Sequence, residues 1–581
     1  MKKSSTFFTI LLVFSLVFVF AGEVRQAKME KTPGQFDPAA YVQAQQLKFN
    51  WLVTEAVPLS TKSIIKVDVT TDEIEAMNSY KCETCGNKAK SRKVRIGIVK
   101  PVSFDMLNAQ SRPAKDGSIV WTAAARSDTA TALRLRFTGF DLPAGASVYI
   151  YNMDGEVFGP YTGKGPGDKG DFWSHTLTGP VAYVQLHTAP GMNKNDVNFK
   201  IAGIGHLGEK FLVPFYMHKE TLEGIDKALT HCPDNEDCVE DASCYSGTAI
   251  NQAKYAAAHM QWISGAYIWY CSGGLIADND TTTETPYFLT ANHCISKSRD
   301  AEGLECYFQY WTTSCHGTCY DPVGACPRTL GATIVDTSRD GDHTLMELSE
   351  LPPAGSVYLG WTNAPVAEAD GTDLFRISHP SGMPQAYSKH SVDSQYIECS
   401  GLPIGEFIYS YDEVGATEGG SSGSPVFNGD GQIVGQLYGA CGYTLEVCDA
   451  EENRTVDGAF AFYYSSVAPY LDNGGGPVGD TMHVSNIVPD LVVQSVFYTA
   501  KAYVTVVDGS GSPVAGATVS GTFSGDLSAS GSAVTDANGV ATISAKKTKT
   551  AIGSFTFCVD NVTLTDYTYE AGDNVETCDT Y

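Results

Sequence analysis

The stretch GGSSGSPVFNGDGQIVGQLYGACG (419–442) decides how the rest of the chain is interpreted. It begins with a tight turn of glycine and serine that Pro425 closes, and it continues into two runs typical of β-strands. Gly420 carries no side chain that could cover the space beside Ser422, so the N–H groups of both residues can face a bound oxygen. By itself, the motif is equally compatible with a surface loop.

A second pattern, CSGGLIADNDTTTETPYFLTANHC (271–294), has a histidine next to its last residue. The run YFLTA predicts a strand that delivers His293, and Cys271 and Cys294 predict a disulfide that holds the histidine's loop against a neighbouring strand. A general base needs such fixed positioning, so His293 is a candidate base.

A third pattern, GDHTLMEL (341–348), has an aspartate as its second residue. Asp342 precedes an alternating strand whose apolar positions predict burial, so its carboxylate can lie beneath an imidazole and away from water. Asp336 and Asp340 are nearby alternatives, and we expect both to be solvated loop residues.

These residue types fit acyl transfer by a serine. The attacking hydroxyl needs an imidazole to take its proton and a carboxylate to orient that imidazole. Backbone N–H groups must hold the oxyanion, and each such donor contributes ~3–4 kcal/mol. The pattern predicts a triad of His293, Asp342 and Ser422, with the N–H groups of Gly420 and Ser422 as the oxyanion donors.

As a set, these segments resemble the chymotrypsin/trypsin clan of secreted serine proteases, and within it the bacterial lysyl endopeptidases. The resemblance spans about residues 232–465 and rests on CSGGLI, YFLTANHC, DHTLMEL, ISHPSGMP, GATEGGSSGSPV and GQLYG. It implies two six-stranded antiparallel β-barrels with the triad in the cleft between them. It also implies a trypsin-like serine endopeptidase that cleaves protein or peptide substrates and needs no metal or cofactor.

The resemblance extends to the substrate-binding residues. Leu437, Tyr438 and Gly439 would pair with the substrate backbone as an added strand. The pocket for the residue before the cut, S1, would take Ala416, Thr417, Glu418, Thr455 and Asp457.

This chain departs from the family at the pocket and at the activation site. Thr455 occupies the position of the family's acidic residue, Ala416 that of the animal trypsins, and Asp457 and Glu418 stand nearby. Cleavage after Lys or Arg and a neutral pocket for apolar or small side chains both stay open. Ser421 replaces the aspartate that pairs with a new N-terminus in animal enzymes, so that activation route is not expected.

The sixteen cysteines, behind an export signal, indicate disulfides. Cys558 and Cys578 are expected to pair because no other cysteine is near them, and a local pair is expected for Cys82 and Cys85. The resemblance implies Cys315 with Cys238 or Cys244, and Cys232 with Cys441 or Cys448. A zinc site at CHGTC (315–319) is the weaker alternative in a secreted protein.

The predicted fold class is all-β: a chymotrypsin-like double β-barrel between a β-rich N-terminal pro-region and a C-terminal β-sandwich. Alternating strands and turns support both flanking regions, and the last resembles the immunoglobulin-like domains of secreted bacterial hydrolases. The predicted divisions are a signal peptide (1–21), a probable propeptide region (22–228), the protease domain (229–470), a linker (471–487) and the sandwich (488–581).

The start of the chain and its charge indicate where it acts. Lys2 and Lys3 precede an apolar run shorter than the ~20 residues that span a bilayer, which predicts a cleaved signal peptide and an extracellular protein. The formal net charge of −27 argues against nucleic-acid partners and against an anionic membrane surface. We expect a monomer whose C-terminal domain has an unknown partner.

Two other functions compete with proteolysis. The letters Gly419 to Gly423 also satisfy GxSxG with Ser421 as nucleophile, and Asp457 and His483 follow in the order of an α/β-hydrolase esterase. That motif needs a strand-to-helix turn, whereas Pro425 and a second strand follow here. The other alternative is a catalytically inactive, protease-like binding protein.

Overall fold

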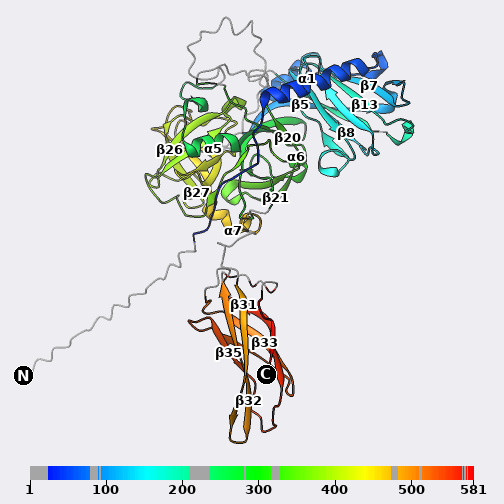
Figure 1. The fold of residues 1–581 in the computed structure, drawn as a ribbon. Helices are drawn as coiled ribbons and strands as arrows, with labels where there is room; N and C mark the ends of the chain where they lie inside the picture. Colours follow the sequence, from blue (N-terminus) through cyan, green and yellow to red (C-terminus); the bar gives the residue numbers. More distant parts are fainter. Residues whose placement is uncertain are drawn as a thin grey trace, which may run out of the picture.

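The computed structural model describes residues 24–78, 89–90, 93–197, 199–208, 235–280, 283–312, 314–315, 326–472, 482–508, 513–564, 567, 569, 571 and 574–581. The predicted signal peptide, Cys82, Cys85, Cys232 and Cys319 lie outside these residues. The fold is all-β with a chymotrypsin-like double barrel, as the sequence predicted (Figure 1). Within the described part of the chain, no helix combines the length and apolar character needed to cross a membrane.

The barrel that carries the serine turn is a closed ring of six antiparallel strands. Its order is β29-β28-β25-β26-β27-β30, and β30 pairs back onto β29. The strands are β25 (Asp373–Ser378), β26 (Ala386–Val392), β27 (Phe407–Val414), β28 (Pro425–Phe427), β29 (Ile433–Gly442) and β30 (Asn453–Ala459). Closure leaves no unpaired edge over most of the ring, which positions loops rigidly at its rim.

The other barrel contains six strands in the order β19-β16-β17-β18-β22-β21. They are β16 (Ala257–Ser264), β17 (Tyr267–Leu275), β18 (Tyr287–Ala291), β19 (Glu305–Phe308), β21 (Ala332–Ser338) and β22 (His343–Leu348). The ends of β18 and β22 lie side by side, because Ala291 is opposite His343 in the register. The two candidate loops that carry His293 and Asp342 are therefore neighbours.

The N-terminal region is a sandwich of two antiparallel sheets. One sheet contains β7 (Ile119–Arg126), β9 (Ser147–Tyr151) and β13 (Val181–His187), and the other contains β5 (Val94–Asp105), β8 (Ala132–Thr138) and β14 (Lys200–Leu207). Inward-facing apolar side chains of both sheets form one buried core, to which Val148, Leu135 and Phe137 contribute. Helix α1 (Pro38–Glu55) packs near β10 (Val157–Tyr161).

This sandwich is continuous with the two barrels. Strand β5 pairs antiparallel with β17, so one sheet runs from the N-terminal sandwich into the first barrel (Figure 1). At the same boundary the fully buried Arg134 lies 3.8 Å from the fully buried Glu305. Two short N-terminal strands, β1 (Gln26–Ala27) and β2 (Glu30–Lys31), also pair with β24 (Trp361–Thr362) and β23 (Val357–Tyr358).

The C-terminal region has a core of its own. Its sheets are β31-β32-β35 and β34-β33-β36-β37, and their facing apolar side chains form one separate cluster. The strands are β31 (Met482–Gln494), β32 (Phe497–Asp508), β33 (Thr518–Gly525), β34 (Ala529–Val534), β35 (Val540–Ser544), β36 (Phe555–Thr563) and β37 (Cys578–Thr580). Strand β31 begins within the predicted linker, because its alternating residues pair with β32 from Met482 onward.

The disulfides confirm part of the expected pairing and correct the rest. Cys271–Cys294, Cys244–Cys315 and Cys558–Cys578 are formed, the last between directly opposed residues of β36 and β37. The expected pairing of Cys232 with Cys441 or Cys448 is wrong, because Cys441 bonds Cys399 and Cys448 bonds Cys238. Because Cys315 forms a disulfide with Cys244, its sulfur is not free to bind zinc as the alternative at 315–319 required.

Candidate active site

The serine turn lies between the two barrels and is held from both sides. The N–H of Ser272, in β17, donates to the carbonyl of Ser422 at 2.9 Å, and the N–H of Gly423 donates to Leu437 in β29 at 2.8 Å. Gly423 has φ +82°, and a Cβ there would meet Thr290 at 2.1 Å, so only glycine fits. Ser422 is thus fixed at the junction of the barrels.

Two carbonyl groups of this turn accept hydrogen bonds, which fixes the direction of the N–H group that follows each of them. The Gly419 carbonyl accepts from the N–H of Ser381 at 2.8 Å, and the Ser421 carbonyl accepts from Ser424 at 3.0 Å. In a trans peptide the N–H points opposite to the carbonyl, so the N–H groups of Gly420 and Ser422 point away from those partners. A Cβ at Gly420 would meet Tyr270 at 2.4 Å. Glycine is required there, for a reason that the sequence alone did not reveal.

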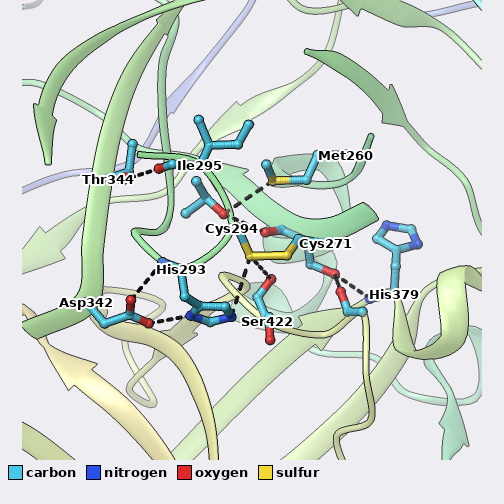
Figure 2. The surroundings of a disulfide bond; sticks show 12 residues. Met260, Cys271, His293, Cys294, Ile295, Asp342, Thr344, His379 and Ser422 are labelled. Carbon is cyan, nitrogen blue, oxygen red and sulfur yellow. Dashed lines mark hydrogen bonds and ion pairs between the residues drawn. A yellow bond between two sulfur atoms is a disulfide. The ribbon is translucent and has the colours of Figure 1, made fainter. Parts of the chain in front are cut away.

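His293 follows strand β18 and is fixed by the disulfide that the sequence predicted. The sulfur of Cys294 lies 3.7 Å from His293 Nε2 and 3.7 Å from the carbonyl oxygen of Ser422. Figure 2 shows Ser422 beside the edge of the imidazole that carries Nε2, with the disulfide above both residues in this view. Tyr438 stands edge-on to the imidazole, with 5.8 Å between the ring centroids.

Asp342 holds the other edge of the imidazole. Its Oδ2 lies 2.6 Å from His293 Nδ1, and its Oδ1 accepts from the backbone N–H of His293 at 2.9 Å (Figure 2). Asp342 adopts φ +48°, a conformation that is unfavourable for a non-glycine residue and is held by neighbouring contacts. Its carbonyl accepts from Gln436 Nε2 at 3.0 Å and from the N–H of Asn292 at 2.9 Å.

The alternative aspartates have other surroundings. Asp336 Oδ2 lies 2.6 Å from Nε2 of a second histidine, His343, which stacks on Tyr463. Asp340 is exposed at the start of the turn. Neither carboxylate contacts His293, whereas Asp342 does so twice.

A cavity of about 70 Å³ opens beside Ser422. Of the predicted substrate-binding residues, Thr417, Glu418, Leu437, Gly439 and Thr455 line it. Four acidic residues and one basic residue contribute to its wall: Asp412, Glu418, Glu446, Asp449 and Arg454. The guanidinium of Arg454 is paired with Asp393 at 2.7 Å and stacks on Tyr396, so its charge is already compensated.

Two predicted pocket residues lie elsewhere. Asp457 is fully buried in an ion pair with Arg376 at 2.5 Å, which also donates to the carbonyl of Ser424 at 2.9 Å. Asp457 therefore supports the serine turn through Arg376, and it does not line the cavity. Ala416 packs in a small apolar cluster with Val239 and Ala386 and is likewise not part of the wall.

Sequence reasoning missed Asp412, which lines the cavity from strand β27. The signal was present in the alternation of YSYDEV (409–414), but no motif marked this residue, because its partners come from neighbouring strands. His390 lies directly opposite it on β26, and Thr455 on β30 donates to it at 2.8 Å. The position of Asp412 depends on how neighbouring strands are aligned, and one sequence does not reveal that alignment.

The surroundings of Ser421 contradict the esterase alternative. Its hydroxyl is fully buried and lies 3.0 Å from the Ser378 hydroxyl, and strand β28 follows the turn where a helix would be required. Of its expected partners, Asp457 pairs with Arg376, and His483 lies in strand β31 of the C-terminal sandwich.

Comparison with known proteins places the protease region. Residues 232–457 match the family model of the lysyl endopeptidase C-terminal domain. The lysyl endopeptidase of Pseudomonas aeruginosa is 29% identical over 367 residues, covering 60% of this chain and 74% of that protein. Secreted RxLR effector protein 73 of Plasmopara viticola is 25% identical over 329 residues, covering 53% and 75%.

The matches among solved structures have low scores, and two of them are peptidases. The HtrA-type protease AlgW with a tripeptide is 12% identical, has a TM-score of 0.29 and covers 52% of this chain and 95% of its own. Kallikrein-related peptidase 10 with Zn²⁺ is 16% identical, has a TM-score of 0.27 and covers 39% and 100%. Scores this low do not bear on the chemistry, which rests on the sequence relatives. Residues 232–457 are thus similar to the C-terminal domain of the lysyl endopeptidases, and this similarity supports a serine peptidase.

Proposed function

We propose that the chain is a secreted serine endopeptidase with His293, Asp342 and Ser422 as its catalytic triad. One observation carries this proposal: Asp342 holds the imidazole through both Nδ1 and the backbone N–H of His293, while Nε2 faces Ser422. With Nδ1–H donating to Asp342, Nε2 is left as the basic nitrogen that a proton acceptor needs.

The reaction then proceeds through an acyl-enzyme. His293 takes the proton of the Ser422 hydroxyl as that oxygen attacks the peptide carbonyl, and the oxyanion is held by the N–H groups of Gly420 and Ser422. His293 next gives the proton to the leaving amine. Water repeats the sequence to release the acyl group, and Asp342 stabilises the imidazolium each time.

The charge of the cavity supports cleavage after a basic residue. Four acidic side chains line the cavity beside Ser422, and its one basic side chain is already paired. A cationic side chain before the cut would therefore meet a negative potential close to the nucleophile.

A peptide-library digestion tests the proposed function. The purified secreted protein and its Ser422→Ala variant are incubated with the library, and the cuts are read by mass spectrometry. We expect cleavage by the wild type alone. Equal cleavage by both would exclude Ser422 as nucleophile, and cleavage by neither would favour the binding-protein alternative.

We also propose that the N-terminal region is a propeptide that occupies the substrate's place. Strand β30 pairs with one edge of β29 from Gly435 to Gly442, whereas β28 covers the other edge only to Gln436. Strand β4 (Ala89–Lys90) pairs antiparallel with Ala440 and Cys441, so it uses that second edge. A substrate strand that pairs with residues 437–439 would need the same edge.

Proline scanning of this strand tests the block. Lys90→Pro removes a backbone N–H from the segment, so the unprocessed protein should cleave peptides faster than the unprocessed wild type. Lys90→Ala, which keeps the backbone, is the matched control. Equal rates for the proline variant and the wild type would refute the proposed occupation of the substrate edge by β4, and this result would not bear on the proposed triad.

We also propose that the protein is exported from the cell. Residues 1–21 would act as a cleaved signal peptide, and the five disulfides of the described residues fit an oxidising, extracellular environment. The N-terminal sequence of the secreted protein checks both cleavages.

A further inference from the structure

We propose that Asp412 is the residue that binds the basic side chain of the substrate, in place of the acidic residue that position 455 lacks. This inference rests on the proposed function, since it names the group that sets the specificity of the same site. Asp412 and Ser422 line one cavity, and Thr417, Leu437 and Gly439 contribute to the same wall.

Asp412 is held in place by two neighbouring side chains. Its Oδ1 lies 2.7 Å from His390 Nδ1 and accepts from Thr455 Oγ1 at 2.8 Å. His390 Nε2 lies 2.7 Å from the Ser388 hydroxyl, so both ring nitrogens of this buried histidine have partners. The carboxylate is therefore fixed through its Oδ1 alone.

The second oxygen of Asp412 is available for a ligand. Within the part of the chain that the structure describes, no donor bonds Oδ2, and the side chain keeps 14% of its surface exposed while His390 is fully buried. A lysine ammonium or an arginine guanidinium could form a charge-assisted hydrogen bond there.

The other acidic residues of the cavity are less suited. Both carboxylate oxygens of Glu418 are engaged, one by the N–H of Glu236 at 2.6 Å and the other by Ser381 at 2.9 Å. Asp449 accepts from Glu452 and Thr444, and Glu446 is exposed at the surface. Asp412 thus differs from them in combining a fixed position, partial burial and an oxygen without a donor.

The carboxylate of Asp412 should make the cavity discriminate between charged and neutral substrate side chains. An apolar side chain that filled the cavity would displace water from Asp412 and leave the carboxylate uncompensated, which is costly in a partly buried site. A cation of similar length would compensate it and gain Coulomb energy in a medium less polar than water. The cavity therefore favours Lys and Arg and rejects their neutral analogues.

The test compares peptide substrates that differ in one charge. Substrates with lysine, norleucine, arginine or citrulline before the cut are hydrolysed by the processed wild type, Asp412→Asn and Glu413→Gln. Asparagine can still accept from His390 and Thr455, so the fold is preserved; thermal unfolding checks this. Glu413 is the matched control, because it is the next acid on the same strand and pairs with Lys389 outside the cavity.

We expect the wild type to cleave after lysine at least ~100-fold faster, in kcat/KM, than after norleucine. Asp412→Asn should lower kcat/KM for lysine about 30- to 5000-fold while leaving kcat/KM for norleucine unchanged or raising it, and Glu413→Gln should match the wild type. Adding Thr455→Asp to Asp412→Asn should restore at least ~10-fold for lysine, since Thr455 is in hydrogen-bond contact with Asp412.

Three results would overturn the inference: a wild-type preference for norleucine, equal losses for both substrates in Asp412→Asn, or no restoration in the double variant. Labelling of Ser422 by a fluorophosphonate separates these from failure of the proposed function. A protein that is labelled and cleaves peptides without a basic preference refutes only the role of Asp412. A folded, processed protein that is neither labelled nor active refutes both proposals.

Discussion

Two of the histidine–aspartate pairs in the double barrel are of almost equal length but differ in which partner is exposed to solvent. In His293–Asp342 (2.6 Å) the histidine is 16% exposed and the aspartate 6%. In His390–Asp412 (2.7 Å) the histidine is fully buried and the aspartate is 14% exposed. In the proposed function the first pair presents a base to Ser422, and in the proposed pocket the second presents a carboxylate to the cavity. Which partner reaches the solvent, more than the pair itself, determines the chemistry that each can do.

The largest expected effect comes from removing the charge of the buried aspartate in the first pair. Asp342→Asn keeps the shape, but the amide can no longer stabilise the imidazolium or hold the correct tautomer, so kcat should fall about 10⁴-fold. Steady-state kinetics on a lysine substrate, together with the melting temperature, checks this. A loss of less than tenfold in a folded variant would refute the role of Asp342.

A buried aspartate outside both pairs should affect stability and not specificity. Asp457→Ala leaves Arg376 buried without its partner, which should lower the free energy of unfolding by about 3–5 kcal/mol. Denaturant unfolding measures this loss. The ratio of lysine to norleucine cleavage should stay at the wild-type value, and a change in that ratio would assign Asp457 to the pocket after all.

Buried histidines without a carboxylate partner should make the fold sensitive to acid. Burial lowers the pKa of His379 to about 4 and that of His259 well below its usual range. Since the unfolded state binds these protons and the folded state does not, stability is lost as the pH falls below about 6.5. Below that pH each histidine should contribute up to about 1.4 kcal/mol per pH unit, and for His379 this loss should continue down to about pH 4. Unfolding curves at several pH values give the slope, and His379→Gln should reduce it; an unchanged slope would contradict the assignment.

The smallest effect is expected from a third pair, His343–Asp336. Its histidine stacks on Tyr463, and neither residue contacts His293 or lines the cavity. Asp336→Asn should therefore change kcat less than ~3-fold and the free energy of unfolding by about 1 kcal/mol. A large drop in kcat at unchanged stability would show that the three pairs are coupled.

The proposed triad was accessible from sequence because each member lies in a local pattern. A strand followed by His293 and a half-cystine, an aspartate before an alternating strand, and a glycine-rich serine turn are all readable along the chain. The contacts of His293 with Asp342 agree with that expectation. The all-β character followed in the same way, from alternating residues and turn signals.

The walls of the cavity depended on tertiary structure. Thr455 and Asp457 are two residues apart on β30, yet one faces the cavity and the other the Arg376 guanidinium. Asp412 gained its position through its register with β26 and its hydrogen bond from Thr455 on β30. The pairing of β5 with β17 joined regions that looked separate in the sequence. Local patterns determine which residues can form a strand or a catalytic turn. Which strands become neighbours, and therefore which charges share a cavity, depends on long-range packing that one sequence encodes only jointly across its length.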